Sequence, residues 1–148
     1  MAKSIQREYE KDFYKWAMHN AKLLRDGRLS EVDIEHVAEE IESMGKGERR
    51  ELVNRLAVLI AHLLKWKYQP IRRSRSWQLT IKEQRVQLTH IFEESPSLKH
   101  EVETKLKDAY EQAAIIAERE TALEEKTFPK ACPFDLNQCL NHRFFPEK

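Results

Sequence analysis

The chain contains 148 residues, of which 41% are hydrophobic and 34% are charged. This composition is too apolar for a disordered protein and too polar for a membrane protein, so we expect one folded domain and no membrane partner. The formal net charge is only +1, but residues 46–92 carry eleven Lys or Arg against three Glu, a net charge of +8. Because the N-terminus has no apolar stretch that could serve as a signal peptide, we expect a cytoplasmic protein.

Glycine and proline mark the boundaries of the predicted helices, because both residue types disfavour helix interiors. Gly27, Gly45, Gly47 and the five prolines all fall between segments with helical periodicity. The segments between these boundaries predict helices over about residues 12–25, 30–44, 48–67, 77–94 and 96–123, and a short helix after Phe134. Ser30, Ser95 and Asp135 are the predicted N-caps of the second, fifth and last helices. No stretch alternates with the period of a strand.

Each predicted helix carries apolar residues at the spacing of one buried face. The predicted buried residues include Phe13, Leu24, Ile34, Ile41, Met44 and Trp77. The third helix is apolar almost all round between Leu56 and Leu64, which is typical of a helix at the centre of a fold. Because short loops make successive helices antiparallel neighbours, the sequence predicts an all-α, up-and-down helical bundle of four to five helices plus a short C-terminal helix. Within one domain over residues 1–148, residues 9–127 would form the main bundle and residues 128–148 an extension that packs on it.

Several separate stretches resemble one known family. They are Y-E-K-D-F-Y-K-W at 9–16, A-E-E-I-E-S-M-G at 38–45, H-L-L-K-W-K-Y-Q-P-I-R-R-S-R-S-W at 62–77 and F-P-K-A-C-P-F at 128–134. In this order they are similar to the all-helical bacterial family catalogued as domain of unknown function 29. The resemblance implies an all-α fold of bacterial origin. It implies no activity, because that family has no assigned chemistry or catalytic residues.

Four polar side chains lie within or beside the apolar faces of the predicted helices. They are Asn20, Glu40, His62 and Gln84. Mid-helix positions lie at similar heights in an antiparallel bundle, so these groups can meet. A buried polar group without a partner costs about 1–3 kcal/mol, which favours a structural hydrogen-bond network. A ligand-binding or catalytic pocket is the alternative.

Arginines and aromatic residues gather around the boundary between the third and fourth predicted helices. The candidate residues for binding an anion or nucleic acid are Arg72, Arg73, Arg75, Lys65 and Trp66. Guanidinium groups mixed with aromatic rings suit phosphate binding and base stacking. The alternative is pairing within the protein, because the flanking segments 1–45 and 93–127 have net charges of −3 and −5.

The sequence favours neither a metal site nor a cofactor. Cys132, Cys139 and His142 supply at most three ligands at a spacing that is uncommon for zinc. A di-metal carboxylate site needs two Glu-x-x-His units, but the chain offers only Asp33-x-x-His36. We therefore expect the two cysteines to be free thiols. No catalytic motif is present, so an enzyme stays an open but less favoured interpretation.

These observations favour a binding or regulatory interaction module, whose partner is another protein or a second copy of the chain. The outward side of the fifth predicted helix, with Tyr110 and Ile115, is the expected surface for self-association. Two alternatives stay open. One is nucleic-acid or anionic-ligand binding through the basic residues 46–92, and the other is an enzyme with a polar pocket between helices.

Overall fold

The computed structural model describes the backbone of residues 2–147 and the side chains of Ile5 and residues 7–147. The described residues form helices and turns without any strand, which confirms the predicted all-α class. The chain divides into two compact units, Met1–Glu48 and Arg49–Lys148. The prediction that residues 1–148 form one domain stays a prediction. None of the described helices combines the length and the hydropathy that crossing a membrane requires.

The N-terminal unit contains α1 (Ala2–Lys11), α2 (Phe13–Arg25), the 3-10 turn η1 (Leu29–Glu31) and the beginning of α3 (Ile34–Tyr68). The sequence predicted α2 but missed α1. A carboxylate oxygen of Asp12 accepts a hydrogen bond from the backbone amide of Lys15 at 3.1 Å and so caps α2. The buried apolar side chains of this unit are Ile5, Trp16 and Leu23. Its apolar core is therefore very small.

Helix α3 is continuous from Ile34 to Tyr68, so the predicted break at Gly45 and Gly47 is wrong. Glycine in a helix interior costs roughly 1 kcal/mol relative to alanine, but it does not remove a hydrogen bond. Without a proline or a left-handed residue at this point, the helical hydrogen bonding continues through both glycines. The predicted cap at Ser30 is also wrong, because Ser30 lies in η1 and α3 begins four residues later.

Several apolar residues that were predicted to be buried in the N-terminal unit are exposed. Ile34, Ile41 and Met44 were predicted to be buried, but they are 65%, 64% and 70% exposed. Within the N-terminal unit, α3 instead packs Val37 against the core of Trp16 and its neighbours. Phe13 and Leu24 of α2 are also exposed, against prediction. A unit of this size has too few apolar surfaces to cover all of these side chains.

Replacing Gly45 with alanine should stabilise the protein by about 0.5–1 kcal/mol, because alanine has the higher helix propensity. A Cβ atom at Gly45 would meet nothing within 4 Å. Denaturant unfolding measures the change. The matched control is Gly27→Ala, which should destabilise because Gly27 has a left-handed φ of +72°. A loss of stability in Gly45→Ala would contradict the account of α3 as an unstrained helix.

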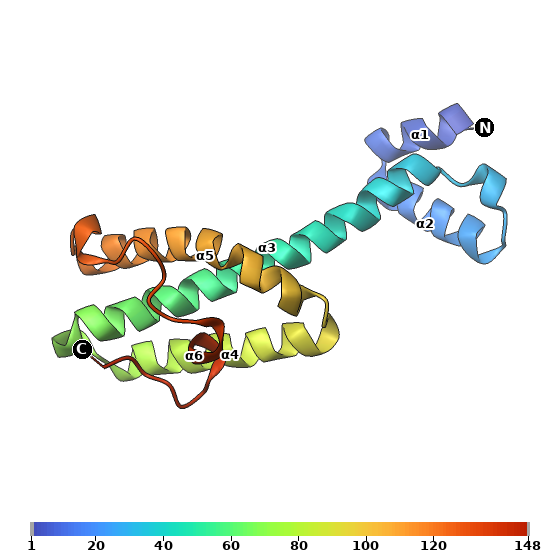
Figure 1. Ribbon diagram of the computed structural model, residues 1–148. Coiled ribbons are helices and arrows are strands. Elements are labelled where there is room, and N and C mark those ends of the chain that lie inside the picture. Colours follow the sequence, from blue (N-terminus) through green and yellow to red (C-terminus); the bar gives the residue numbers. More distant parts are fainter. Residues whose placement is uncertain (1, 148) are drawn as a thin grey trace. The chain divides into compact units, whose positions relative to one another are not determined.

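The C-terminal unit is a bundle of long helices. The second half of α3 packs with α4 (Arg75–Glu94) and α5 (Leu98–Thr121), and the short helix α6 (Leu136–Leu140) contacts α4 (Figure 1). Two 3-10 turns, η2 (Pro70–Arg72) and η3 (Glu125–Thr127), follow α3 and α5. The predicted cap at Ser95 is wrong, because Ser95 ends α4 and α5 begins at Leu98. The predicted cap of the last helix is confirmed, since Asp135 forms a capping box with Gln138.

The core of the C-terminal unit is built around α3, as its all-round apolar stretch predicted. Its fully buried residues include Leu56, Leu59, Ile60, Leu63 and Leu64. The segment after α5 returns across the helices in Figure 1 and adds Phe128, Phe134 and Cys139 to the same core. Tyr110, predicted to face outward, is buried, and its hydroxyl donates a hydrogen bond to the carbonyl oxygen of Pro129 at 2.5 Å. Ile115 is 62% exposed, as expected.

Candidate anion-binding site

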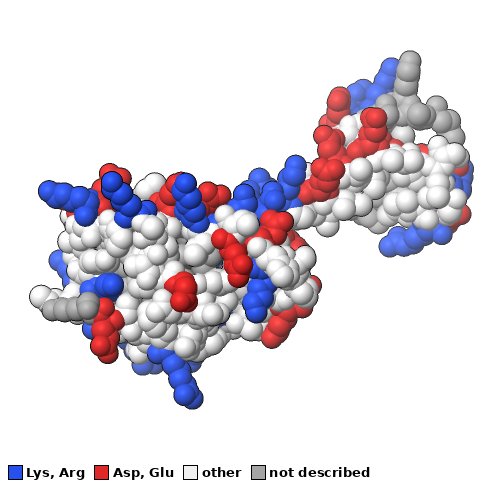
Figure 2. All heavy atoms as spheres, viewed as in Figure 1, with Lys and Arg blue, Asp and Glu red and all other residues white. Residues whose placement is uncertain are grey.

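Charges of the basic segment 46–92 are partly neutralised by acidic side chains of α5. Lys65 Nζ donates to Glu120 Oε1 at 2.7 Å, and Arg49 Nη1 donates to Glu101 Oε2 at 3.4 Å. The hydrogen bond from Lys65 lowers the pKa of the Glu120 carboxyl below its ordinary value. On the face shown in Figure 2, Lys and Arg side chains are interspersed with Asp and Glu along the margin of the C-terminal unit, instead of forming one continuous basic surface.

Most of the five residues predicted to bind an anion are engaged within the protein. The ammonium of Lys65 also lies 4.7 Å from the centroid of the Trp77 ring, and Trp77 is half-buried where a core position was predicted. Arg73 Nε donates to the backbone carbonyl of Trp66 at 2.8 Å, and its guanidinium lies 5.0 Å from the centroid of that ring. Arg72 and Arg75 are exposed.

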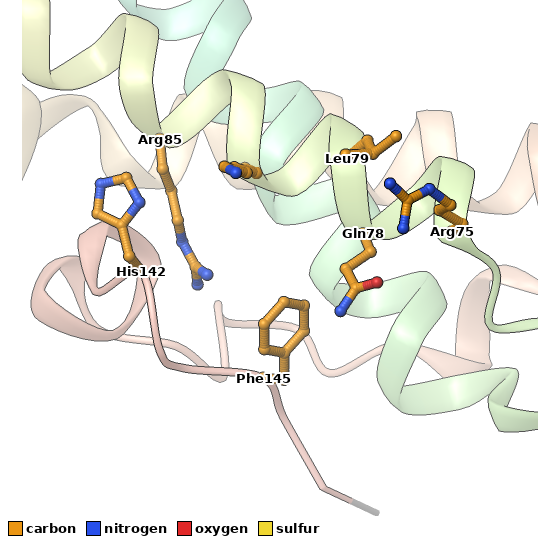
Figure 3. A pocket seen from close by; sticks show the side chains of 7 residues that line it. Arg75, Gln78, Leu79, Arg85, His142 and Phe145 are labelled. Carbon is orange, nitrogen blue, oxygen red and sulfur yellow. The ribbon is translucent and has the colours of Figure 1, made fainter.

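Arg75 lines a pocket that the sequence did not predict. This pocket lies between α4 and the segment that follows α6, and it has a volume of about 350 Å³. The residues that line it are Arg75, Gln78, Leu79, Lys82, Arg85, His142 and Phe145 (Figure 3). The five α4 residues recur at the spacing of one helix face, so α4 forms one wall. His142 and Phe145 form the other.

Arg85 is the buried cation of this pocket, since only 1% of its surface is exposed. Its Nε donates to the carbonyl oxygen of Cys139 at 2.7 Å, and its Nη2 donates to the carbonyl oxygen of Gln138 at 3.2 Å. In Figure 3 its side chain descends from α4 between His142 and Phe145. Two neutral carbonyl groups therefore hold the guanidinium in a fixed orientation.

Among the described residues, the charge of Arg85 has no acidic counterpart. No carboxylate of the described residues forms an ion pair with Arg85, Arg75 or Lys82, and none lines the pocket. Burial lowers the pKa of Arg85, but an arginine stays protonated because its ordinary pKa exceeds 12. The pocket therefore combines a fixed buried cation with two exposed cations.

The four polar residues predicted to meet lie in both units. Asn20 and Glu40 belong to the N-terminal unit, and His62 and Gln84 to the C-terminal unit. Among the described residues, no hydrogen bond joins any two of the four. His62 Nδ1 lies 2.9 Å from the carbonyl oxygen of Val58 in its own helix, and burial lowers its pKa. His62 and Gln84 do not line the pocket described above.

Asn20 belongs to a polar network around Asp33 in the N-terminal unit. Asn20 Oδ1 accepts a hydrogen bond from the Asp33 backbone amide at 2.8 Å, and Asn20 Nδ2 donates to the carbonyl oxygen of Trp16 at 2.9 Å. Asp33 Oδ2 accepts from Trp16 Nε1 at 2.9 Å and from His36 Nδ1 at 2.7 Å. Asp33 Oδ1 is buried without a hydrogen-bond partner.

Glu40 is tied to the same network through Tyr9. The Tyr9 hydroxyl donates a hydrogen bond to Glu40 Oε1, and this bond raises the pKa of Tyr9 to about 12. The Tyr9 ring stacks on the imidazole of His36, with centroids 3.9 Å apart. This arrangement joins α1 and α2 to the start of α3.

The Asp33–His36 pair should make the N-terminal unit most stable between about pH 4 and 6.5. Burial alone would raise the pKa of Asp33, but hydrogen bonds from His36 and Trp16 lower it, so this stabilisation is lost as the pH falls through the folded pKa. The hydrogen bond to Asp33 raises the pKa of His36. The stabilisation that His36 contributes is therefore lost as the pH rises through its pKa in the folded state. Amide hydrogen exchange in α1 and α2 measures the loss of stability on both the acid side and the alkaline side of this pH range.

His36→Gln is the informative variant for this pH dependence. It should remove the loss of protection above about pH 6.5 and retain the loss at low pH, where Asp33 titrates. The control is His19→Gln, which makes the same substitution at an exposed histidine of α2. An unchanged alkaline limb in His36→Gln would show that another group is responsible.

The fold and the pocket together define an all-helical protein with a cationic pocket on its C-terminal unit. The model of the family described as domain of unknown function DUF29 matches residues 8–145, and the chain belongs to this family. No curated protein and no solved structure matches the chain. The family resemblance of the sequence motifs is thus confirmed. Within the described residues, no group of three or more His, Cys, Asp or Glu side chains could hold a metal ion.

Proposed function

We propose that this protein is a binding module for a small anionic ligand, which occupies the pocket between α4 and the segment after α6. The observation that carries the proposal is the buried guanidinium of Arg85, which has no carboxylate partner among the described residues. A buried charge is costly unless another charge compensates it. A bound anion would supply that compensation.

Each lining residue has a role that follows from its chemistry. Arg85 is held by two carbonyl groups, so its remaining N–H groups are oriented before the ligand arrives, and a guanidinium matches the oxygens of a phosphate or carboxylate. Arg75 and Lys82 add positive charge at the exposed side. Leu79 and Phe145 offer apolar contact. A volume of about 350 Å³ suits a small phosphorylated or carboxylated molecule.

Calorimetric titration with pyrophosphate tests the proposal. Arg75→Gln and Lys82→Gln should each weaken binding by about fivefold to tenfold, because each removes a charge-assisted contact. The matched control is Arg72→Gln, which removes the same charge from an exposed arginine that does not line the pocket. Equal weakening by Arg72→Gln would indicate nonspecific attraction. An absence of binding at millimolar pyrophosphate would contradict the proposal.

An interaction module is the second candidate, and the exposed apolar residues of α3 favour it. Ile34, Ile41 and Met44 recur at helical spacing and are each more than 60% exposed. We expect such a face to be covered by a protein partner or by a second copy of the chain. Light scattering should then show a dimer that Met44→Glu dissociates. A monomer at high micromolar concentration would rule out the second copy as the partner.

A further inference from the structure

A groove of about 750 Å³ lies between α5 and the segment that follows this helix. Its apolar lining includes Ile115, which is 62% exposed, and the largely buried rings of Tyr110 and Phe128. The hydroxyl of Tyr110 donates a hydrogen bond to the carbonyl oxygen of Pro129, so the two sides of the groove are joined to each other. The groove is therefore a fixed feature of the C-terminal unit, with apolar surface open to solvent.

Three exposed glutamates line the same groove. Glu111 and Glu118 lie seven residues apart on α5, and Glu125 begins η3. None of the three forms an ion pair within the described residues. Lys126 and Lys130 also line the groove, but Lys126 is already paired with a neighbouring glutamate at 3.1 Å. The groove thus combines apolar surface with an excess of unpaired negative charge.

The turn η2 carries the complementary features. Its Ile71 is 98% exposed, the highest value among the large apolar side chains that the structure describes. Arg72 is also exposed and forms no ion pair with the described residues. The turn is anchored on both sides, because Gln69 Nε2 donates to the carbonyl oxygen of Thr121 at 3.3 Å and Arg73 Nε donates to a backbone carbonyl of α3 at 2.8 Å. An apolar side chain on a fixed turn loses little conformational entropy when it binds.

The turn η2 and the groove belong to one end of the C-terminal unit. The hydrogen bond between Gln69 and Thr121 places η2 beside the end of α5, and Figure 1 shows the ends of α3 and α5 at the same end of this unit. Ile71 does not fill the groove of its own chain, because it is almost fully exposed and does not line it. A projecting side chain beside a complementary groove suits two-fold pairing, since each copy then offers both parts.

We propose that the protein forms a two-fold symmetric dimer in which Ile71 of each copy enters the groove beside α5 of the other copy. In this pairing Ile71 contacts the apolar lining, and Arg72 pairs with Glu118, the middle one of the three glutamates along the chain. The surface differs from the exposed α3 residues of the N-terminal unit, and the dimer does not depend on anion binding. Because two such contacts are small compared with a stable interface, we expect a dissociation constant on the order of 10 μM.

Sedimentation velocity of the full chain over a range of concentrations measures the dimer. Ile71→Asp should weaken dimerisation about a hundredfold, because the symmetry removes two apolar contacts at once and each contributes about tenfold. Circular dichroism should show an unchanged fold, since Ile71 is exposed. The matched control is Leu29→Asp, which alters a 59% exposed apolar side chain in the other described unit's 3-10 turn, η1, and should leave the dimer intact.

Exchanging the two charges tests the pairing of Arg72 with Glu118. Arg72→Glu and Glu118→Arg should each weaken dimerisation about tenfold or more, because like charges then face each other in both contacts. A chain that carries both substitutions should regain most of the lost affinity, since opposite charges face each other again. Single variants that weaken the dimer without recovery in the double variant would overturn this pairing.

The remaining outcomes decide between the proposed dimer and other arrangements. A monomer at high micromolar concentration would overturn the inference, and so would a dimer that Ile71→Asp leaves intact. A dimer that Met44→Glu dissociates and Ile71→Asp does not would assign self-association to α3 instead. Ile71 does not line the Arg85 pocket, so Ile71→Asp should bind pyrophosphate as the unaltered protein does. Failure of the dimer and failure of anion binding are therefore distinguishable.

Discussion

Trp16→Ala is expected to unfold the N-terminal unit while the C-terminal core stays protected. Trp16 is 3% exposed and provides the largest side chain of a core that it shares with Ile5 and Leu23. Truncating a buried tryptophan costs about 3–5 kcal/mol. The variant also removes the indole N–H that donates to Asp33, which adds about 1–3 kcal/mol for a buried carboxylate that loses a partner.

Hydrogen exchange resolves this effect by region, because the amides of α1 and α2 should lose protection and those around Leu59 should keep it. Trp16→Phe is the graded control, since it keeps most of the ring volume and removes only the bond to Asp33. Tyr14→Ala is the neutral control, because Tyr14 is 74% exposed on the same helix. Equal loss of protection in both units would contradict the independence of the small core around Trp16.

The elements that the sequence predicted well are those whose signal is local. Between Leu56 and Leu64 every residue except Val58 and His62 is buried, because a helix that is apolar almost all round has little surface suited to water. The cap at Asp135 was readable for the same reason, since both partners of its capping box lie within four residues. Local periodicity and capping therefore sufficed for the all-α class.

The errors in the fold arise where burial depends on distant partners. Gly45 and Gly47 look like a helix end in the sequence, but the backbone stays helical through both of them. Ile34 and Ile41 have the spacing of a core face, yet none of the described side chains of the N-terminal unit covers them. Periodicity shows that a face is apolar and does not show what lies against it.

The pocket was missed because two segments far apart in the sequence build it. Arg75 was singled out within the arginine cluster, but His142 and Phe145 reach the pocket only because the chain after α5 returns to α4. The helical wheel placed Gln84 on the inner face of α4, whereas its neighbour Arg85 is the buried residue. An error of one residue in helix phase rotates a side chain by about 100°. The spacing of Arg85 after Ile81 was the available signal, since i and i+4 share a face.

Arg85→Ala is expected to release the segment that contains α6. The substitution leaves the carbonyl groups of Cys139 and Gln138 without their donor, at a cost of about 1–3 kcal/mol for each group that stays buried. It also opens a cavity next to Phe145, whose ring centroid lies 5.6 Å from the guanidinium. We expect a total loss of about 3–5 kcal/mol, visible as faster hydrogen exchange and proteolysis after residue 128.

Arg85→Met separates the structural role of this side chain from its charge. Methionine fills much of the same volume and removes the cost of a buried charge, so it should destabilise less than alanine does. It should nevertheless abolish the rise in melting temperature that pyrophosphate causes in the unaltered protein, because binding stabilises the folded state only where a site exists. Lys82→Met, at an exposed position of the same helix, should reduce that rise without releasing the segment. If Arg85→Met keeps the full response to pyrophosphate, the buried guanidinium is a structural clamp for α6 and the anion binds elsewhere.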